Sequence, residues 1–202
     1  MVTDDSTYHH GDLRRALLEA AASAIEESGV AALSLPELSR RAGVSHAAPA
    51  HHFGDKAGLL TALAAEGYAR LADALNAADN FLETGVAYVR FAARHRAHFE
   101  VMFSPALYHS DDPALVEARD RAAAVLYRGA EEMPDAAADP GAVQEAALAA
   151  WSMAHGFATL WLSGSLPGLG TTPDDAARRV LRELIDGADR GARGHRGAHF
   201  DG

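Results

Sequence analysis

The chain has 202 residues and a mass of 21.2 kDa; 49% of its residues are hydrophobic and 23% are charged. It has enough apolar side chains for a folded core, which excludes a disordered tail, a collagen-like repeat and a disulfide-stapled module. The absence of cysteine excludes zinc fingers, iron–sulfur clusters and thiolate nucleophiles. Because the formal net charge is −10, any DNA binding is expected to be confined to one region of the surface.

The first eleven residues are polar, and no stretch reaches the roughly 18 to 20 apolar residues that a membrane span requires. We therefore expect neither a signal peptide nor an association with a membrane, and a cytoplasmic location.

Two helices are expected near the N-terminus. Leucine and alanine residues at spacings of three and four predict a first helix over residues 11–28, and Gly29 is placed to end it in a left-handed conformation. The sequence Ser-Leu-Pro-Glu from Ser34 is typical of a capping box, so a second helix is expected to begin there. This helix has to be short, because Gly43 follows nine residues later.

A third helix is expected to begin at Ser45 as its N-cap and to end near Gly54, and Asp55 is expected to cap a long fourth helix. No stretch alternates apolar and polar residues as a strand would, so the fold is predicted to be all-α, with about nine helices. The Gly-rich tail, residues 191–202, is expected to be flexible. The remaining helices are predicted over residues 81–95, 97–103, 113–132, 141–163 and 173–189.

A short helix, a glycine turn and another short helix, preceded by a longer helix, is the layout of a helix-turn-helix. Leu38, Ala42, Val44 and Phe53 would form its core, and Gly43 would adopt the backbone conformation of the tight turn. The third helix would then enter the major groove with a face of mostly small side chains, which offers few hydrogen bonds to base edges. This face comprises His46, Ala47, Ala48, Ala50 and His51.

Four stretches carry a family pattern with its spacing intact: His10 to Arg14, Leu33 to Ser45, His52 to Lys56, and Leu59-Leu60. In them the chain resembles the TetR/AcrR family of transcriptional regulators. The sequence Trp151-Ser-Met-Ala-His-Gly156 further resembles the signature of the branch whose C-terminal domain is named WHG.

The resemblance implies a ligand-responsive transcriptional repressor, which binds a palindromic double-stranded DNA operator as a homodimer and is released by a small-molecule effector. It also implies a helix-turn-helix DNA-binding domain over residues 1–55, and an effector-binding and dimerisation domain over residues 56–190.

For the DNA-binding domain, the resemblance implies phosphate contacts from Ser34, His52 and Lys56, while His46 and His51 would reach toward bases or backbone. The complete set expected to bind DNA is Ser34, Ser45, His46, Ala47, Ala48, Ala50, His51, His52 and Lys56.

Two positions in this domain depart from the family pattern. Pro49 replaces a large aliphatic residue, and it is tolerable in the first turn after Ser45. Ala50 replaces a tyrosine that typically holds a phosphate, which removes a hydroxyl donor and an aromatic surface.

The helix over residues 141–163 is apolar on all sides, so it is expected to lie between an effector cavity and a partner subunit. The last helix has a matching apolar stripe, with Arg178, Arg179 and Arg182 facing water; two such helices from each subunit would form a four-helix bundle. The interface would include Phe157, Leu160, Gly164, Val180, Leu181, Leu184 and Ile185.

A mostly aromatic set of residues suits a small, largely apolar effector. For each of them the alternative is plain core packing, and His155 could bond either an effector or a neighbouring helix. The candidate pocket residues are Phe91, Phe99, Met102, Phe103, Trp151, His155 and Trp161.

Other classes of function receive little support. A metal site could use His95 and His98, or His195 and His199, but arginines flank the first pair, and no metal or cofactor is expected. No catalytic constellation is present, so we do not expect an enzyme. The alternative left open is an interaction or sensor protein of the same fold with weakened DNA binding, which Ala50 and the acidic first domain favour.

Overall fold

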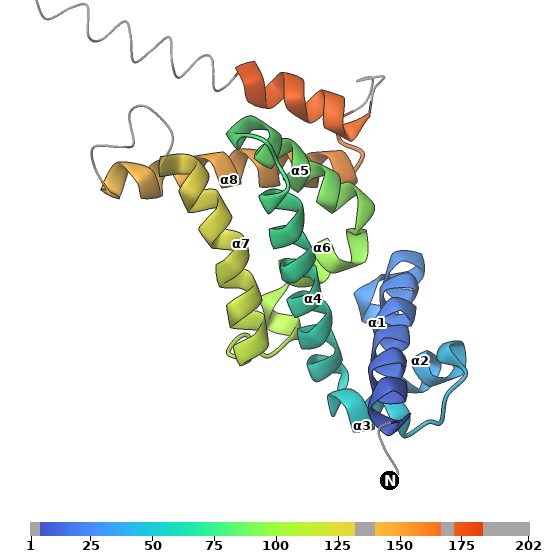
Figure 1. Cartoon of the computed structure of the whole chain (residues 1–202). Helices are drawn as coiled ribbons and strands as arrows, with labels where there is room; N and C mark the ends of the chain where they lie inside the picture. Colours follow the sequence, from blue (N-terminus) through green and yellow to red (C-terminus); the bar gives the residue numbers. More distant parts are fainter. Residues whose placement is uncertain (1–4, 132–139, 167–171, 184–202) are drawn as a thin grey trace, which may run out of the picture. The chain divides into compact units, whose positions relative to one another are not determined.

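The computed structural model describes residues 5–131, 140–166 and 172–183. These residues contain helices and no strand, which confirms the all-α prediction, and residues 173–183 are also helical (Figure 1). The remaining elements are α1 (Asp5–Ala32), α2 (Leu35–Ala42), α3 (Ala48–Phe53), α4 (Lys56–Asn76), α5 (Phe81–Arg94), α6 (Arg96–Met102), the 3-10 helix η1 (Pro105–Leu107), α7 (Pro113–Glu131) and α8 (Pro140–Leu162).

The chain forms two compact units. Of the described residues, those up to Ala69 and those in His95–Arg119 belong to unit 1, whereas Arg70–Arg94 and those from Asp120 onward belong to unit 2. Unit 1 therefore holds more than the predicted DNA-binding domain, because it also contains α6, η1, the first two thirds of α4 and the start of α7.

Side-chain caps set the helix boundaries where the sequence predicts them. The Ser34 hydroxyl oxygen accepts the Glu37 N–H at 3.4 Å, and the Asp55 carboxylate accepts the Gly58 N–H at 2.8 Å. Gly43 follows α2 in the left-handed region (φ 66, ψ 31), which glycine adopts without a steric penalty. The predicted starts of the second and fourth helices are therefore confirmed.

The predicted start of the third helix is wrong. Ser45 is not its N-cap; α3 begins at Ala48, and the Ser45 carbonyl instead accepts the Ala48 N–H in a turn, at 3.0 Å. A helix capped at Ser45 would place Pro49 where its missing N–H has to donate to the Ser45 carbonyl. Starting at Ala48 puts Pro49 in the first turn, where no such bond is required.

The predicted break at Gly29 is present, but helical structure continues beyond it. Gly29 has a non-helical backbone (φ 78, ψ 160), and α1 runs across this kink to Ala32. The kink redirects the chain just before α2.

Unit 1 is built around α1, which packs against both α2 and α6. Leu17, Leu38 and Leu59 are completely buried in its core. Phe53 is half-buried, and the Arg14 guanidinium lies 5.4 Å from the centre of its ring. Close helix packing depends on Gly67, where a Cβ would lie 2.6 Å from the Met102 sulfur.

Unit 2 is built around the pair α5 and α8, which lie side by side in Figure 1. Two ion pairs tie α5 to the helical residues 173–183: Arg90 to Asp174 at 2.6 Å, and Arg178 to both carboxylate oxygens of Glu83 at 2.7 and 2.8 Å. The expectation that Arg178 faces water is therefore wrong, because the guanidinium meets a carboxylate 95 residues away in the sequence.

Candidate nucleic-acid interface and the C-terminal residues

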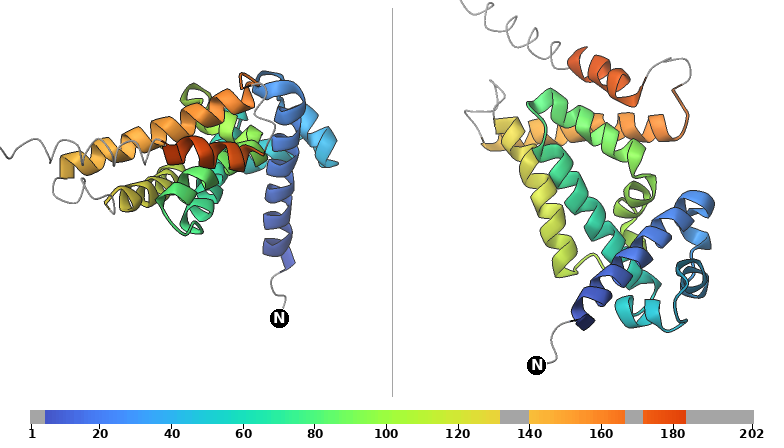
Figure 2. Two further views of the ribbon diagram at one scale, coloured as in Figure 1. Left: turned by 90° about the horizontal axis from the view of Figure 1, so that it is seen from above. Right: turned by 45° about the vertical axis from the view of Figure 1, so that its right-hand side comes forward.

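The helix-turn-helix consists of α2, the turn from Gly43, and α3, which pack together in unit 1 (Figure 2). His46, Ala47, Ala50 and His51 are exposed, as the sequence predicts for a face that meets DNA. Pro49 is completely buried, so it fills the core position that an aliphatic side chain takes in the family pattern. Of the other predicted DNA contacts, Ser34 and Ser45 are exposed, whereas Ala48, His52 and Lys56 are partly buried.

The arginines of α2 are held in an ion-pair cluster. Arg40 binds both carboxylate oxygens of Glu37, at 2.6 and 2.9 Å. Arg41 binds Glu37 at 3.0 Å and Glu27 of α1 at 2.7 Å. Hydrogen bonds from the two arginines lower the pKa of Glu37 to about 2, so this carboxylate stays ionised at any physiological pH.

This cluster was missed in the sequence analysis, although part of it was visible. Glu37 stands three and four residues before Arg40 and Arg41, a spacing at which side chains meet on a helix. Glu27 lies on another helix, and no local pattern points to it.

Lys56 is also engaged within the domain. Its ammonium group donates to the Val30 carbonyl at 2.9 Å and to the Ala31 carbonyl at 3.3 Å, at the C-terminal end of α1. A cation at this position satisfies carbonyls that have no partner inside the helix. Two of the three ammonium protons are therefore directed at the protein backbone.

In unit 2, Trp151 and His155 of α8 meet Tyr88 of α5, a residue that the sequence analysis missed. The indole N–H of Trp151 donates to the Tyr88 hydroxyl oxygen at 3.3 Å, and this oxygen lies 2.8 Å from His155 Nδ1. Because an indole can only donate, the Tyr88 oxygen accepts from Trp151, while the tautomer of the imidazole sets which group donates in the bond between Tyr88 and His155. Burial lowers the pKa of His155, in agreement with a neutral ring.

In unit 1, a second aromatic group surrounds the end of α6. The rings of Phe99 and Phe103 are 4.9 Å apart, and Tyr68 packs edge-on against Phe103. The hydroxyl groups of Tyr68 and Tyr108 both donate to the Met102 carbonyl, at 3.2 and 2.8 Å. Burial raises the pKa of Tyr68 to about 12.

The predicted pocket residues thus fall into separate sets. Phe99, Met102 and Phe103 belong to unit 1. The set in unit 2 comprises Phe91, which is buried, Trp161, which stacks on Phe157 at 6.1 Å, and the pair Trp151 and His155.

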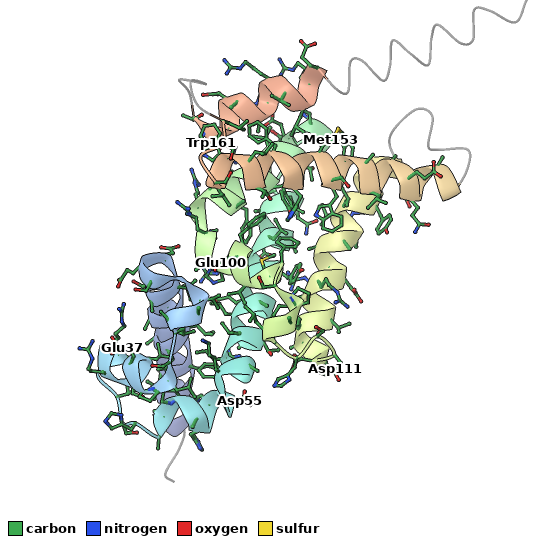
Figure 3. All side chains as sticks on the ribbon, turned by 180° about the vertical axis from the view of Figure 1, so that it is seen from behind. Glu37, Asp55, Glu100, Asp111, Met153 and Trp161 are labelled. Carbon is green, nitrogen blue, oxygen red and sulfur yellow. The ribbon has the colours of Figure 1, made fainter. Side chains whose placement is uncertain are left out.

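The predicted interface residues differ in exposure. Leu160 and Val180 are 47% and 41% exposed, and Gly164 is exposed. Phe157 and Leu181 are buried within the subunit, while Leu184 and Ile185 lie outside the described residues. The side chains labelled Met153 and Trp161 in Figure 3 come from α8.

The described residues lack two kinds of feature. They contain no group of three or more His, Cys, Asp or Glu side chains that could hold a metal ion, and His195 and His199 lie outside them. Their helices also include none with the length and apolar character that crossing a bilayer demands.

A helix-turn-helix followed by a helical domain defines the class of DNA-binding regulators with a separate ligand-binding domain. Residues 17–63 match the family model of bacterial regulatory proteins of the tetR family, and residues 81–184 match that of a tetracyclin repressor-like C-terminal domain. The chain belongs to the tetR family, as its resemblance indicated, and the C-terminal match fits the expected branch. Members of this family are transcription regulators and not enzymes.

Solved structures agree with this assignment. A protein with unknown function from Rhodococcus sp. RHA1 is 37% identical, with a TM-score of 0.71; the match covers 89% of this chain and 97% of that one. The TetR family transcriptional regulator PfmR from Thermus thermophilus is 24% identical, with a TM-score of 0.58 and coverage of 84% and 96%.

The multidrug binding protein EbrR, solved with imidazole, is 23% identical, with a TM-score of 0.52 and coverage of 85% and 94%. At this identity the likeness shows the fold alone. None of the curated proteins matches the chain.

Proposed function

We propose that the protein is a repressor that binds a palindromic DNA operator as a homodimer and leaves it when a small, largely apolar effector binds. The observation that carries the proposal is the helix-turn-helix, in which α3 presents exposed His and Ala side chains beside a left-handed glycine turn. A dimer of such domains binds two half-sites related by the same two-fold axis. Residues 1–55 would bind DNA, and residues 56–190 would bind the effector and the second subunit.

At the DNA, His46 and His51 would contact bases or phosphates, and Ala47, Ala48 and Ala50 would allow close approach to the groove. Ser34, Ser45 and His52 would add contacts to the backbone. Lys56 has one ammonium proton beyond the two that it donates to α1, and this proton would face a phosphate.

The effector would contact aromatic side chains of the C-terminal domain, among them Trp151 and His155. Trp151 is 38% exposed and lies at the end of a hydrogen-bonded group, so its ring is both accessible and fixed in orientation. A flat, oriented aromatic surface suits an apolar or aromatic ligand. The exposed apolar side chains of Leu160 and Val180 would pack against the second subunit.

Effector and operator would be coupled through α4, a continuous helix whose residues up to Ala69 belong to unit 1 and whose last turns belong to unit 2. A change in the tilt of α4 would change the separation of the two DNA-binding domains. If the effector lowers the affinity for DNA by a given factor, the DNA must lower the affinity for the effector by the same factor, because the coupling between two binding sites is reciprocal.

Selection of duplexes from a random pool tests the proposal. A repressor of this kind enriches one palindrome, and fluorescence anisotropy then serves to screen small apolar compounds for those that release it. If no sequence is enriched, or if every compound that binds leaves the operator affinity unchanged, the proposal fails.

Two observations favour a second function, that of a sensor or interaction protein with weakened DNA binding. Ala50 is exposed but has no hydroxyl group, and Arg40 and Arg41 are bound to carboxylates of their own domain. This function predicts weak binding to all duplexes with no preference among them.

A further inference from the structure

We propose that Glu37 limits the affinity of the protein for DNA, because it holds Arg40 in an ion pair that the arginine has to give up before it can bind a phosphate. The proposal rests on the DNA-binding function proposed above and adds a residue that opposes it.

Among the residues that the structure describes, Glu37 is the carboxylate that binds Arg40. Two of its nitrogens bind the two oxygens of Glu37 at 2.6 and 2.9 Å, and its side chain is 71% exposed. Glu37 lies in the first turn of α2 and is labelled in Figure 3. The cation is thus at the surface, where a second anion can reach it.

The position of the pair on α2 connects it with DNA. In a helix-turn-helix the first of the two helices crosses the phosphate backbone, and Arg40 and Arg41 occupy the last turn of that helix. A guanidinium binds a phosphate through the same forked pair of N–H groups that it offers to a carboxylate. Glu37 and a phosphate therefore compete for the same donors.

Arg41 differs from Arg40 in two respects. It binds Glu27 at 2.7 Å in addition to Glu37, and its side chain is 29% exposed. Removing the charge of Glu37 therefore releases Arg40, whereas Arg41 retains a carboxylate partner. The structure assigns the main effect to one arginine.

The variant Glu37→Gln tests the proposal. An exposed ion pair contributes a factor of roughly 1.4 to 5, so the variant is expected to bind DNA more tightly by about this factor. Where the wild type keeps the ion pair on DNA, the variant gains one phosphate contact, which steepens the dependence of log affinity on log salt by about 0.9. The affinities for the operator and for a scrambled duplex should rise by the same factor, because both duplexes carry the same phosphates.

Two controls separate the effect from a general change of charge. The variant Glu19→Gln removes the same charge from an exposed pair with Arg15 on α1, and it should raise the affinity by clearly less than Glu37→Gln does. In an Arg40→Ala background, Glu37→Gln should no longer raise the affinity, because the arginine through which it acts is gone.

The outcomes also separate this proposal from the DNA-binding function. If the wild-type protein prefers a palindrome but Glu37→Gln leaves affinity and salt dependence unchanged, the limiting role of Glu37 is refuted and the repressor function stands. A gain in DNA affinity that persists in the Arg40→Ala background also overturns the proposal, because the gain would then come from the change in net charge and not from the release of Arg40. If no duplex is preferred by the wild type, the repressor function fails, whereas a gain on scrambled duplex still supports the competition.

Discussion

The junction between α3 and α4 depends on the absence of a side chain at Gly58. A Cβ built at this position lies 2.0 Å from the carbonyl oxygen of Phe53, a backbone atom that cannot rotate out of the way. Ordinary contact would require a retreat on the order of 1 Å, and the same carbonyl accepts the Asp55 N–H at 3.0 Å. The variant Gly58→Ala therefore disturbs the end of the helix that is proposed to enter the major groove.

The cost of Gly58→Ala follows from one favourable and two unfavourable terms. Alanine in a helix is favoured over glycine by about 0.8 to 1.0 kcal/mol, whereas overpacking of this kind costs about 1 to 3 kcal/mol, and the strained hydrogen bond adds about 0.5 to 1.5 kcal/mol. The net expectation is a loss of about 0.5 to 4 kcal/mol of stability. At Gly156 of α8 a Cβ meets nothing within 4 Å, so Gly156→Ala should gain stability there.

Urea denaturation followed by circular dichroism measures both variants under the same conditions. A lowered midpoint for Gly58→Ala beside an unchanged or raised midpoint for Gly156→Ala is the expected result. Equal midpoints for the two variants would refute the steric argument, because intrinsic helix propensity would then account for both.

Three further predictions concern stability. Burial lowers the pKa of His155, so the unfolded chain binds a proton that the folded protein disfavours; stability should fall as the pH drops below about 6.5, and His155→Phe should flatten this part of a pH series of thermal melts. Arg178→Met should lower the free energy of unfolding by at most about 1 kcal/mol in urea denaturation, because the ion pair of Arg178 with Glu83 is partly exposed. Arg179 is exposed, so Arg179→Met serves as the control; an equal loss in both variants would show that the pair contributes nothing. Asp112 caps α7 by accepting two backbone N–H groups, so Asp112→Ala should lower stability by about 1 kcal/mol while Asp112→Asn preserves most of it, and equal losses for both would contradict a capping role.

Local sequence was sufficient for most of the helix boundaries. Ser34, Gly43 and Asp55 act within four residues of their own positions, so their effects on the chain could be predicted without knowledge of the tertiary structure. The predicted start of α3 is wrong because the Ser45 hydroxyl was given more weight than the missing N–H of Pro49. The helix begins where the proline falls in its first turn.

Contacts between distant parts of the chain could not be predicted in this way. The Tyr88 hydroxyl meets His155 across 67 residues, and Lys56 meets the Val30 carbonyl across 26. Neither pair has a periodic pattern, because such contacts follow from how helices pack and not from spacing along one helix. The aromatic residues of the C-terminal domain were recognised, but their grouping and the part taken by Tyr88 required the structure.

The proposed repressor function requires that the helix-turn-helix distinguishes one DNA sequence from others. An anisotropy titration of the purified protein against its selected palindrome and a scrambled duplex, at two salt concentrations, measures this property. We predict a preference for the palindrome that persists at the higher salt concentration, since base contacts do not release counterions. Weak binding that is equal for both duplexes and disappears with salt would contradict the proposed function.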